Sequence, residues 1–225
     1  MATTKKTEVV EITPLKLQKT KLEIVGDTPL IVHAWSVKAK RQMLEAQMGT
    51  SKGKKKEAKN PVADFIDSMY WLTDMPEEKT EEAFYEAVEN GARFGFPVVG
   101  LKKAAISAAY RMGWSKDKVS LQGSFFLSGA GQLGDSGLDM LDIISDPPIM
   151  REDMVKIGMG TADLRYRGEF RNWKTTVDLT YNASGQYSLE NIISMINAGG
   201  LTCGIGEWRV EKGGQNGMFH VQIED

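Results

Sequence analysis

Catalytic sites are usually built from histidine, cysteine and carboxylate side chains, and these are few and scattered in this chain. The two histidines, His33 and His220, each lie in a short apolar run without a partner motif. Cys203 is the single cysteine, which excludes an internal disulfide and a multi-cysteine zinc site. The aspartates between residues 135 and 146 lack the ordered spacing of a calcium loop and are typical of caps and turns. The sequence therefore predicts no enzyme, no metal site and no cofactor.

Arginine and aromatic residues alternate in one segment, L-R-Y-R-G-E-F-R, which ends just before a tryptophan. Guanidinium groups bind phosphates, and aromatic rings stack on bases, so this mixture favours single-stranded nucleic acid. The alternative is an exposed strand edge with ordinary cross-strand pairs. If the segment binds nucleic acid, the contacts are Arg165, Arg167, Arg171 and Trp173.

A lysine-rich stretch, Ser36–Asn60, carries eight basic and two acidic residues. Its second half, G-T-S-K-G-K-K-K-E-A-K-N-P, has almost no apolar side chain to bury and predicts a mobile loop. Lysines on such a loop neutralise phosphates and release counterions. A solvated loop that only keeps the protein in solution is the alternative. The predicted phosphate contacts here are Lys52, Lys54, Lys55 and Lys56.

Glycine is concentrated near the C-terminus, with seven glycines in Ala198–Ile223. Glycine permits positive φ and lets the backbone approach another chain closely. We expect a glycine-rich hairpin whose backbone N–H groups face a sugar-phosphate chain, with Arg209 as a fixed donor. A plain flexible hairpin is the alternative. The glycines expected to allow this approach are Gly204, Gly206, Gly213 and Gly214.

The elements that must position these residues follow from periodicity and capping signals. Alternating apolar residues predict strands at Lys16–Val25, Val119–Leu127 and Trp173–Tyr181, whereas Met154–Gly160 is expected to be irregular. This order of elements suits an α+β domain with a mixed or antiparallel sheet. The predicted helices are Val37–Met48, Thr80–Asn90, Gly100–Met112 and Ser188–Asn197.

Composition places the chain among ordinary globular proteins. It has 225 residues, 41% of them hydrophobic, with a net charge of −2 and a pI near 5.8. Any binding of nucleic acid must therefore be local. The first residues lack the apolar core of a secretory signal, and no apolar run approaches the roughly 20 residues that cross a bilayer. We expect a cytoplasmic protein without a membrane partner.

Three segments resemble the RAMP superfamily, which includes the backbone subunits of CRISPR effector complexes. They are L-E-I-V-G-D-T-P-L-I-V-H, F-P-V-V-G-L-K-K-A-A-I-S-A-A-Y-R, and the glycine-rich G-G-L-T-C-G-I-G-E-W-R-V-E-K-G-G-Q-N-G-M-F-H-V. The third segment is the most specific of them. The chain departs from the family in being shorter than many backbone subunits and in lacking the acidic nuclease residue that some members carry.

The resemblance implies a single domain over residues 1–225 with a modified ferredoxin- or RRM-like antiparallel sheet and helices on one face. Residues 36–72 would be an inserted basic, thumb-like arm, and a glycine-rich hairpin would lie at the C-terminus. Lys102 and Lys103 would approach the nucleic acid. Family members contact the backbone of single-stranded RNA or DNA with successive subunits and with little sequence preference.

We therefore expect a non-enzymatic protein that binds single-stranded RNA or DNA and self-associates along the strand. It could be a stand-alone relative encoded by a virus or mobile element. A viral structural or inhibitory protein-interaction module is an alternative, favoured by the acidic pI and by Tyr70 and Trp71. A nuclease that uses Asp135 or Asp163 with a divalent metal is a further one.

Overall fold

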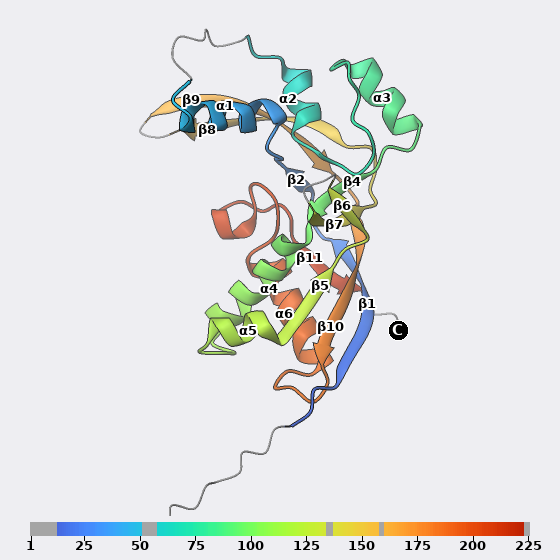
Figure 1. Cartoon of the computed structure of the whole chain (residues 1–225), viewed down its shortest axis with the longest axis vertical. Helices are drawn as coiled ribbons and strands as arrows, with labels where there is room; N and C mark the ends of the chain where they lie inside the picture. Colours follow the sequence, from blue (N-terminus) through green and yellow to red (C-terminus); the bar gives the residue numbers. More distant parts are fainter. Residues whose placement is uncertain (1–12, 51–57, 134–136, 158–159, 223–225) are drawn as a thin grey trace, which may run out of the picture.

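A computed structural model of the chain describes residues 13–50, 58–133, 137–157 and 160–222. It has an α+β fold with antiparallel sheets, as predicted (Figure 1). The central sheet has the strand order β11-β1-β10-β5, and each neighbouring pair is antiparallel. Its strands are β1 (Leu17–Gly26), β5 (Phe125–Ser128), β10 (Lys174–Asn182) and β11 (Phe219–Gln222).

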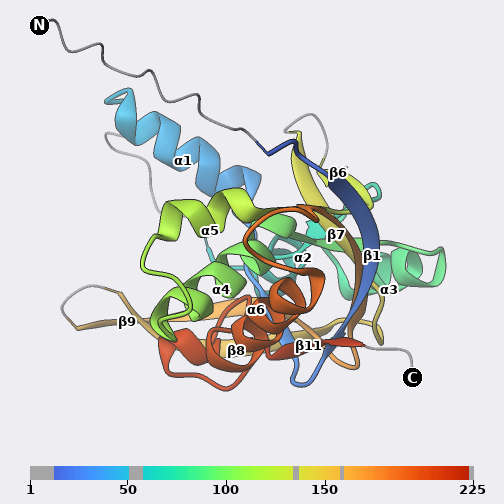
Figure 2. The same cartoon turned by 90° about the horizontal axis from the view of Figure 1, so that it is seen from below.

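The helical crossovers of this sheet define its topology. Helix α4 (Val98–Arg111) and the short α5 (Lys118–Ser124) precede β5, and α6 (Leu189–Thr202) connects β10 to β11. In each half the two strands flanking the crossover are separated by one strand of the other half, which is the split β-α-β arrangement of ferredoxin- and RRM-like folds. Helices α4 and α6 cover the same face of the sheet (Figures 1 and 2).

The two crossover helices pack unusually closely because α6 contains glycine at the contact. A Cβ on Gly199 would lie 2.6 Å from the amide nitrogen of Ala105 in α4, and one on Gly200 would clash with the carbonyl oxygen of Phe219 in β11. The sequence prediction ended this helix at Asn197. Instead the helix continues through both glycines, since tertiary packing outweighs their low helix propensity.

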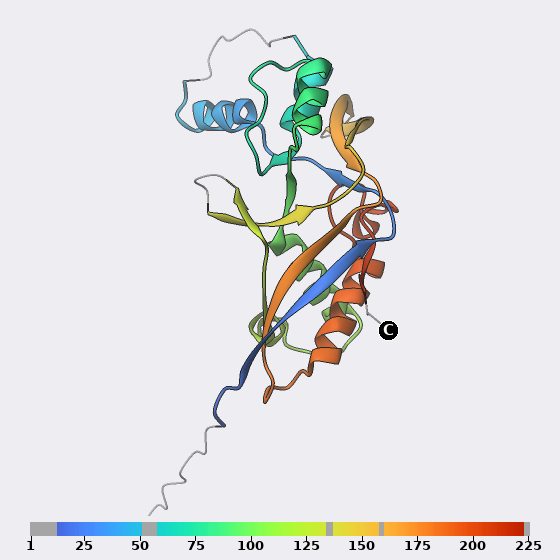
Figure 3. The same cartoon turned by 90° about the vertical axis from the view of Figure 1, so that its right-hand side faces the viewer.

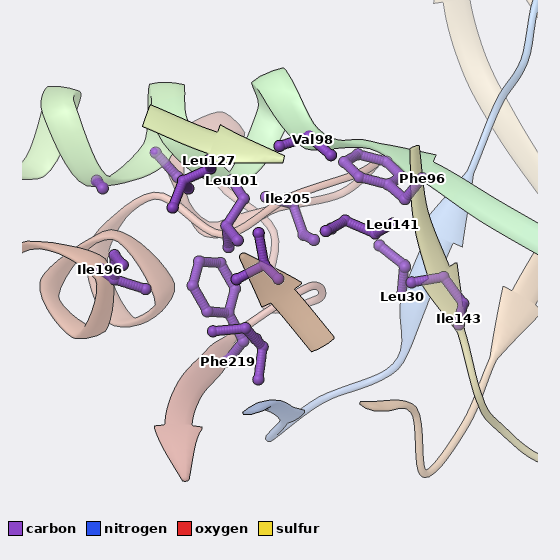
Figure 4. Packing of buried hydrophobic residues seen from close by; sticks show 14 of the residues in the cluster. Leu30, Phe96, Val98, Leu101, Leu127, Leu141, Ile143, Ile196, Ile205 and Phe219 are labelled. Carbon is purple, nitrogen blue, oxygen red and sulfur yellow. The ribbon is translucent and has the colours of Figure 1, made fainter. Parts of the chain in front are cut away.

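Apolar side chains from the sheet and the two helices form the core between them (Figure 4). Alternation along β10 directs Val177 and Leu179 inward, while the residues between them face solvent. Burying one such aliphatic or aromatic side chain stabilises a fold by about 1.5–3 kcal/mol. Core residues from the other elements include Leu101, Leu127, Ile196 and Phe219.

Two insertions meet at one end of this core (Figures 1 and 3). They interlock, because the β2-β9-β8 and β3-β4-β7-β6 sheets each take strands from both. The first insertion contains β2 (Leu30–Val32), α1 (Val37–Gln47), α2 (Pro61–Asp67), β3 (Tyr70–Trp71), α3 (Glu81–Glu89) and β4 (Phe94–Pro97). The second contains β6 (Gly131–Leu133), β7 (Leu138–Ile143), β8 (Ile149–Ile157) and β9 (Thr161–Phe170).

The structure corrects three local predictions. The strand expected at Val119–Leu127 begins as helix α5, because Asp117 caps it by accepting the amide hydrogen of Val119 at 2.9 Å. The segment expected to be irregular after residue 154 continues β8, which pairs with β9 through residue 157. Between α6 and β11 the chain forms a loop with one 3-10 turn (Val210–Lys212) instead of a two-stranded hairpin.

A membrane-spanning segment was not expected from the sequence. No helix in the described part of the chain has both the length and the apolar character needed to span a bilayer.

Candidate nucleic-acid interface

A cavity of about 690 Å³ lies where α1 and α2 face the β8–β9 hairpin. Two aromatic side chains line it: Trp35, which is 59% exposed, and the half-buried Tyr166. The basic residues that line it are Lys59, Lys156, Arg165 and Arg167, and the acidic ones are Asp64, Asp67 and Glu207.

A second cavity, of about 440 Å³, lies between α4–α5 and the glycine-rich loop that follows α6. Glu207 lines both cavities, so they adjoin at this residue. In Figure 1 the loop lies between the β8–β9 hairpin and α4. We call the two adjoining cavities the groove. The charged residues of its second part are Lys103, Lys118, Arg209, Glu207 and Glu211.

Positive charge predominates in the groove although the whole chain is acidic. Seven basic and four acidic side chains line it. Lys103, Lys118 and Lys156 form no ion pair with any residue that the structure describes, so their charges are available to a ligand. An excess of uncompensated cations in a concave surface attracts phosphate groups.

The two arginines of β9, Arg165 and Arg167, occupy different environments. Arg165 binds Asp163 at 2.9 Å and keeps 39% of its side chain exposed in the groove. Arg167 is buried, because it contacts Asp153 at 3.1 Å and Glu207 at 3.4 Å. These contacts leave Arg165 accessible to a ligand and make Arg167 chiefly a structural residue.

Arg171 lies at the end of β9, outside the groove, and the prediction that places it beside Arg165 is wrong. It binds Glu169 at 2.8 Å, and Arg151 binds the other carboxylate oxygen of Glu169 at 2.9 Å. Burial alone would raise the pKa of Glu169, but the hydrogen bonds from Arg171 and Arg151 lower it below its ordinary value. A buried carboxylate paired in this way is fully satisfied within the protein.

His33 lies at the wall of the first cavity, and its Nδ1 accepts a hydrogen bond from Nε of Arg167 at 3.1 Å. Burial lowers the pKa of His33, and the charge of Arg167 lowers it further, so the ring is neutral near pH 7. With Nδ1 as the acceptor, this hydrogen-bond network assigns the proton to Nε2. A ring in this state donates a hydrogen bond and has no free lone pair to act as a general base.

Trp173 does not reach the groove, and the prediction that it stacks on a base is wrong. Only 1% of the residue is exposed, and its ring packs directly against Gly26. Its Nε1 donates to the carbonyl oxygen of Thr28 at 2.8 Å, which satisfies the buried indole.

The two lysines of α4 point in different directions. Lys103 is exposed and lines the groove, as predicted for a phosphate contact. Lys102 is half-buried outside the groove, with its ammonium 5.5 Å from the ring centre of Phe125 and 5.8 Å from that of Phe126. Burial lowers the pKa of Lys102. One residue of a helix turns the side chain by about 100°, which explains the difference.

Two glycines of the loop, Gly206 and Gly214, allow close packing within the protein, whereas a Cβ on Gly213 would meet no atom within 4 Å. Gly204 and Gly206 line the groove with φ of +68° and +78°, and a Cβ on Gly206 would clash with the carbonyl oxygen of Ile31. Gly213 and Gly214 lie outside the groove, and a Cβ on Gly214 would clash with the carbonyl oxygen of Trp208. At Gly206 and Gly214 the close approach that glycine permits is therefore to this chain's own backbone.

Several groove residues were not predicted from the sequence. Lys59 belongs to the lysine-rich segment and Tyr166 to the arginine–aromatic segment, so composition alone could have indicated both. Trp35 and Lys156 carry no such signal, since only the folded insertions bring them together. The four arm lysines, Lys52, Lys54, Lys55 and Lys56, lie outside the described residues.

The described residues offer little to a nuclease that depends on a metal. No group of three histidine, cysteine or carboxylate side chains among them could hold a metal ion. Asp163 is held by Lys59 at 2.7 Å and by Arg165 at 2.9 Å, and Asp135 lies outside the described part of the chain.

Comparison with known proteins finds a distant similarity among solved structures. No protein-family model matches the chain, and no curated protein matches it. Among solved structures, the chain is similar to Cmr6 from Pyrococcus furiosus, with 8% sequence identity and a TM-score of 0.40. The alignment covers 93% of this chain and 100% of that one.

Proposed function

We propose that the protein binds single-stranded nucleic acid in the groove, without catalysis and with little dependence on sequence. The observation that carries the proposal is the convergence of basic side chains from both insertions and from α4 on one concave surface of an otherwise acidic chain. The buried free thiol of Cys203 suits a reducing compartment such as the cytoplasm.

The basic side chains would bind the phosphates of the strand. Lys103 and Lys118 lie on one side of Glu207, and Lys156 and Arg165 lie on the other, so the strand would run along both cavities. Contacts of this kind are independent of sequence and weaken as salt rises.

Two aromatic side chains could receive bases. Trp35 presents an exposed ring in the first cavity, and Tyr166 lines the same cavity with the ammonium of Lys59 5.9 Å from its ring centre. A base that stacks on an aromatic ring gains about 1–3 kcal/mol whatever its identity. A single strand exposes its bases for such contacts, whereas a duplex hides them.

Fluorescence anisotropy with a labelled single-stranded oligonucleotide tests the proposal. We expect Lys103→Glu and Arg165→Glu each to weaken binding about tenfold or more, because each change removes a charge-assisted contact and adds a repulsive charge. Arg93→Glu is the control: Arg93 is an exposed arginine paired with Asp142 and lines neither cavity. Unchanged affinity of both groove variants at moderate salt would contradict the proposal.

We further propose that successive copies align along one strand. Mass measurements of complexes with oligonucleotides of increasing length would then rise in steps of one 24.9 kDa chain. A complex that stays at one copy whatever the length of the strand would rule out this part of the proposal.

A viral structural or inhibitory protein-interaction module remains the second candidate. Tyr70 and Trp71 do not support it, because Trp71 is buried and Tyr70 is half-buried. The exposed apolar side chains of Met43 and Leu44 on α1 favour it instead. Purified protein with a low ratio of absorbance at 260 and 280 nm and no affinity for single strands would favour this candidate.

A further inference from the structure

Glu207 is the one residue that lines both cavities among those that the structure describes, and it is held rigidly there. Its amide donates to the carbonyl oxygen of Ile31 at 2.8 Å. It lies between Gly206, with φ of +78°, and Trp208, with φ of +50°. A left-handed conformation at a non-glycine residue costs about 1 kcal/mol or more, and such strain is concentrated at functional positions.

The carboxylate of Glu207 is only partly engaged within the protein. Its Oε2 lies 3.4 Å from Nη2 of Arg167, and 42% of the side chain is exposed. Arg167 is itself held by Asp153 and by His33, which fixes this side of the carboxylate. Oε1 has no hydrogen bond to any part of the chain that the structure describes, so it is available as an acceptor.

A strand that follows the groove must pass this carboxylate. Basic residues on both sides attract phosphates, whereas a phosphate beside Glu207 would be repelled. The part of the nucleotide that faces Glu207 must therefore be neutral and able to donate a hydrogen bond. Nucleic acids have two kinds of such donor. One is the base N–H groups, namely the amino groups of cytosine, adenine and guanine and the ring N–H of guanine, thymine and uracil; the other is the 2′-hydroxyl of ribose.

We propose that Glu207 accepts a hydrogen bond from a neutral donor on the nucleotide that crosses between the two cavities, and so determines which strands bind best. This inference rests on the proposed function. A base donor would give preference among bases, toward cytosine or adenine for an amino group and toward thymine or uracil for a ring N–H. A 2′-hydroxyl would give preference for RNA over DNA of the same base sequence.

Binding of homopolymers of equal length tests the inference and separates its two arms. Oligo(dC), oligo(dA) and oligo(dT) compare bases on one sugar, and oligo(rU) with oligo(dU) compares sugars on one base. We expect wild-type protein to show about a tenfold preference in one of the two comparisons, since one good polar contact discriminates by at least that much. Glu207→Ala should abolish the preference by strengthening binding of the disfavoured strand, and Glu207→Gln should restore part of it.

Glu86→Gln is the matched control. Glu86 is an exposed glutamate on α3 and lines neither cavity. This variant should keep the wild-type preference. Thermal unfolding of each variant confirms that loss of the contact to Arg167 has not unfolded the chain.

The outcomes separate the inference from the function on which it rests. Suppose that wild-type protein binds all homopolymers with equal affinity and that Glu207→Ala raises the affinity for each of them by the same factor. This result would overturn the inference but would agree with the proposed function. A preference that persists unchanged in Glu207→Ala would also overturn it. Failure of wild-type protein to bind any single strand would overturn both.

Discussion

At the scale of single residues, burial separates the arginines and aromatics that the sequence pattern groups together. Arg165 and Arg167 are two positions apart on β9, yet one is exposed in the groove and the other is enclosed by Asp153, Glu207 and His33. Residue types and spacing predict a nucleic-acid ligand, and that ligand stays a prediction. They could not show which side chains the protein uses for its own ion pairs, because those partners come from distant parts of the chain.

His33 should make stability depend on pH. Its pKa lies below 6.5 in the folded protein, so the folded state resists protonation of the ring. The stability that this neutral ring contributes is present above pH 6.5 and is lost as pH falls through the folded pKa. The carboxylates of Glu207 and Asp64 also face His33 and act in the opposite direction on its pKa, but burial and Arg167 outweigh them.

We therefore expect His33→Gln to reduce the loss of stability between pH 6.5 and 5. Glutamine keeps an acceptor for Arg167 but does not titrate. Urea unfolding of both proteins at several pH values measures the effect. Parallel curves for wild type and variant over this range would contradict the expectation.

Trp173 should matter for stability and not for binding. Trp173→Phe leaves the carbonyl oxygen of Thr28 without its donor and removes part of a buried ring. We expect a loss of about 2 kcal/mol in the free energy of unfolding. Folded variant should bind single strands with wild-type affinity, and a tenfold loss of affinity would restore a role for this side chain in stacking.

At the scale of elements, capping and periodicity predicted the long helices and the central strands well. Thr80 caps α3 and Ser188 caps α6 as their sequences indicate. The wrong predictions of secondary structure have a common physical cause. In each of these segments, contacts with distant parts of the chain determine the conformation. Gly199 and Gly200 resemble loop residues, but α6 needs them for contact with α4 and β11, and β8 forms because β9 lies beside it.

The contact between α4 and α6 can be tested at Gly199. Alanine normally stabilises a helix relative to glycine by roughly 0.5–1 kcal/mol. Gly199→Ala should do the opposite, because its Cβ would press on the backbone of Ala104 and Ala105 at 2.6–2.8 Å. Gly123→Ala in α5 is the control, since no atom lies within 4 Å of its Cβ position and the ordinary gain is expected. Thermal or urea unfolding measures whether each variant is more or less stable than wild-type protein.

At the scale of the whole molecule, the split β-α-β core agrees with the fold that the family resemblance implied. The arrangement of the insertions could not be predicted, because β2 pairs with β9, and β4 with β7, across long stretches of sequence. The groove depends on those pairings. Four of its basic residues, Lys103, Arg165, Arg167 and Arg209, were predicted from the sequence, whereas Lys118, Lys156 and Trp35 were not.

The charge of the groove as a whole should appear in the salt dependence of binding. The logarithm of the association constant should fall linearly with the logarithm of salt concentration, with a slope set by the number of phosphates neutralised. Lys103→Glu should reduce the magnitude of that slope by about one. An affinity that does not change between low and moderate salt would show that phosphates are not bound.

The two interlocked insertions place the candidate binding surface in segments that are distinct from most of the hydrophobic core. The first cavity is lined mainly by segments added to the core, whereas the hydrophobic interior belongs largely to the strands and helices beneath them. Relatives could therefore lengthen, shorten or recharge these segments and acquire new ligands while inheriting the same scaffold. Divergence within such a lineage should be fastest in the insertions and slowest in the glycines of α6.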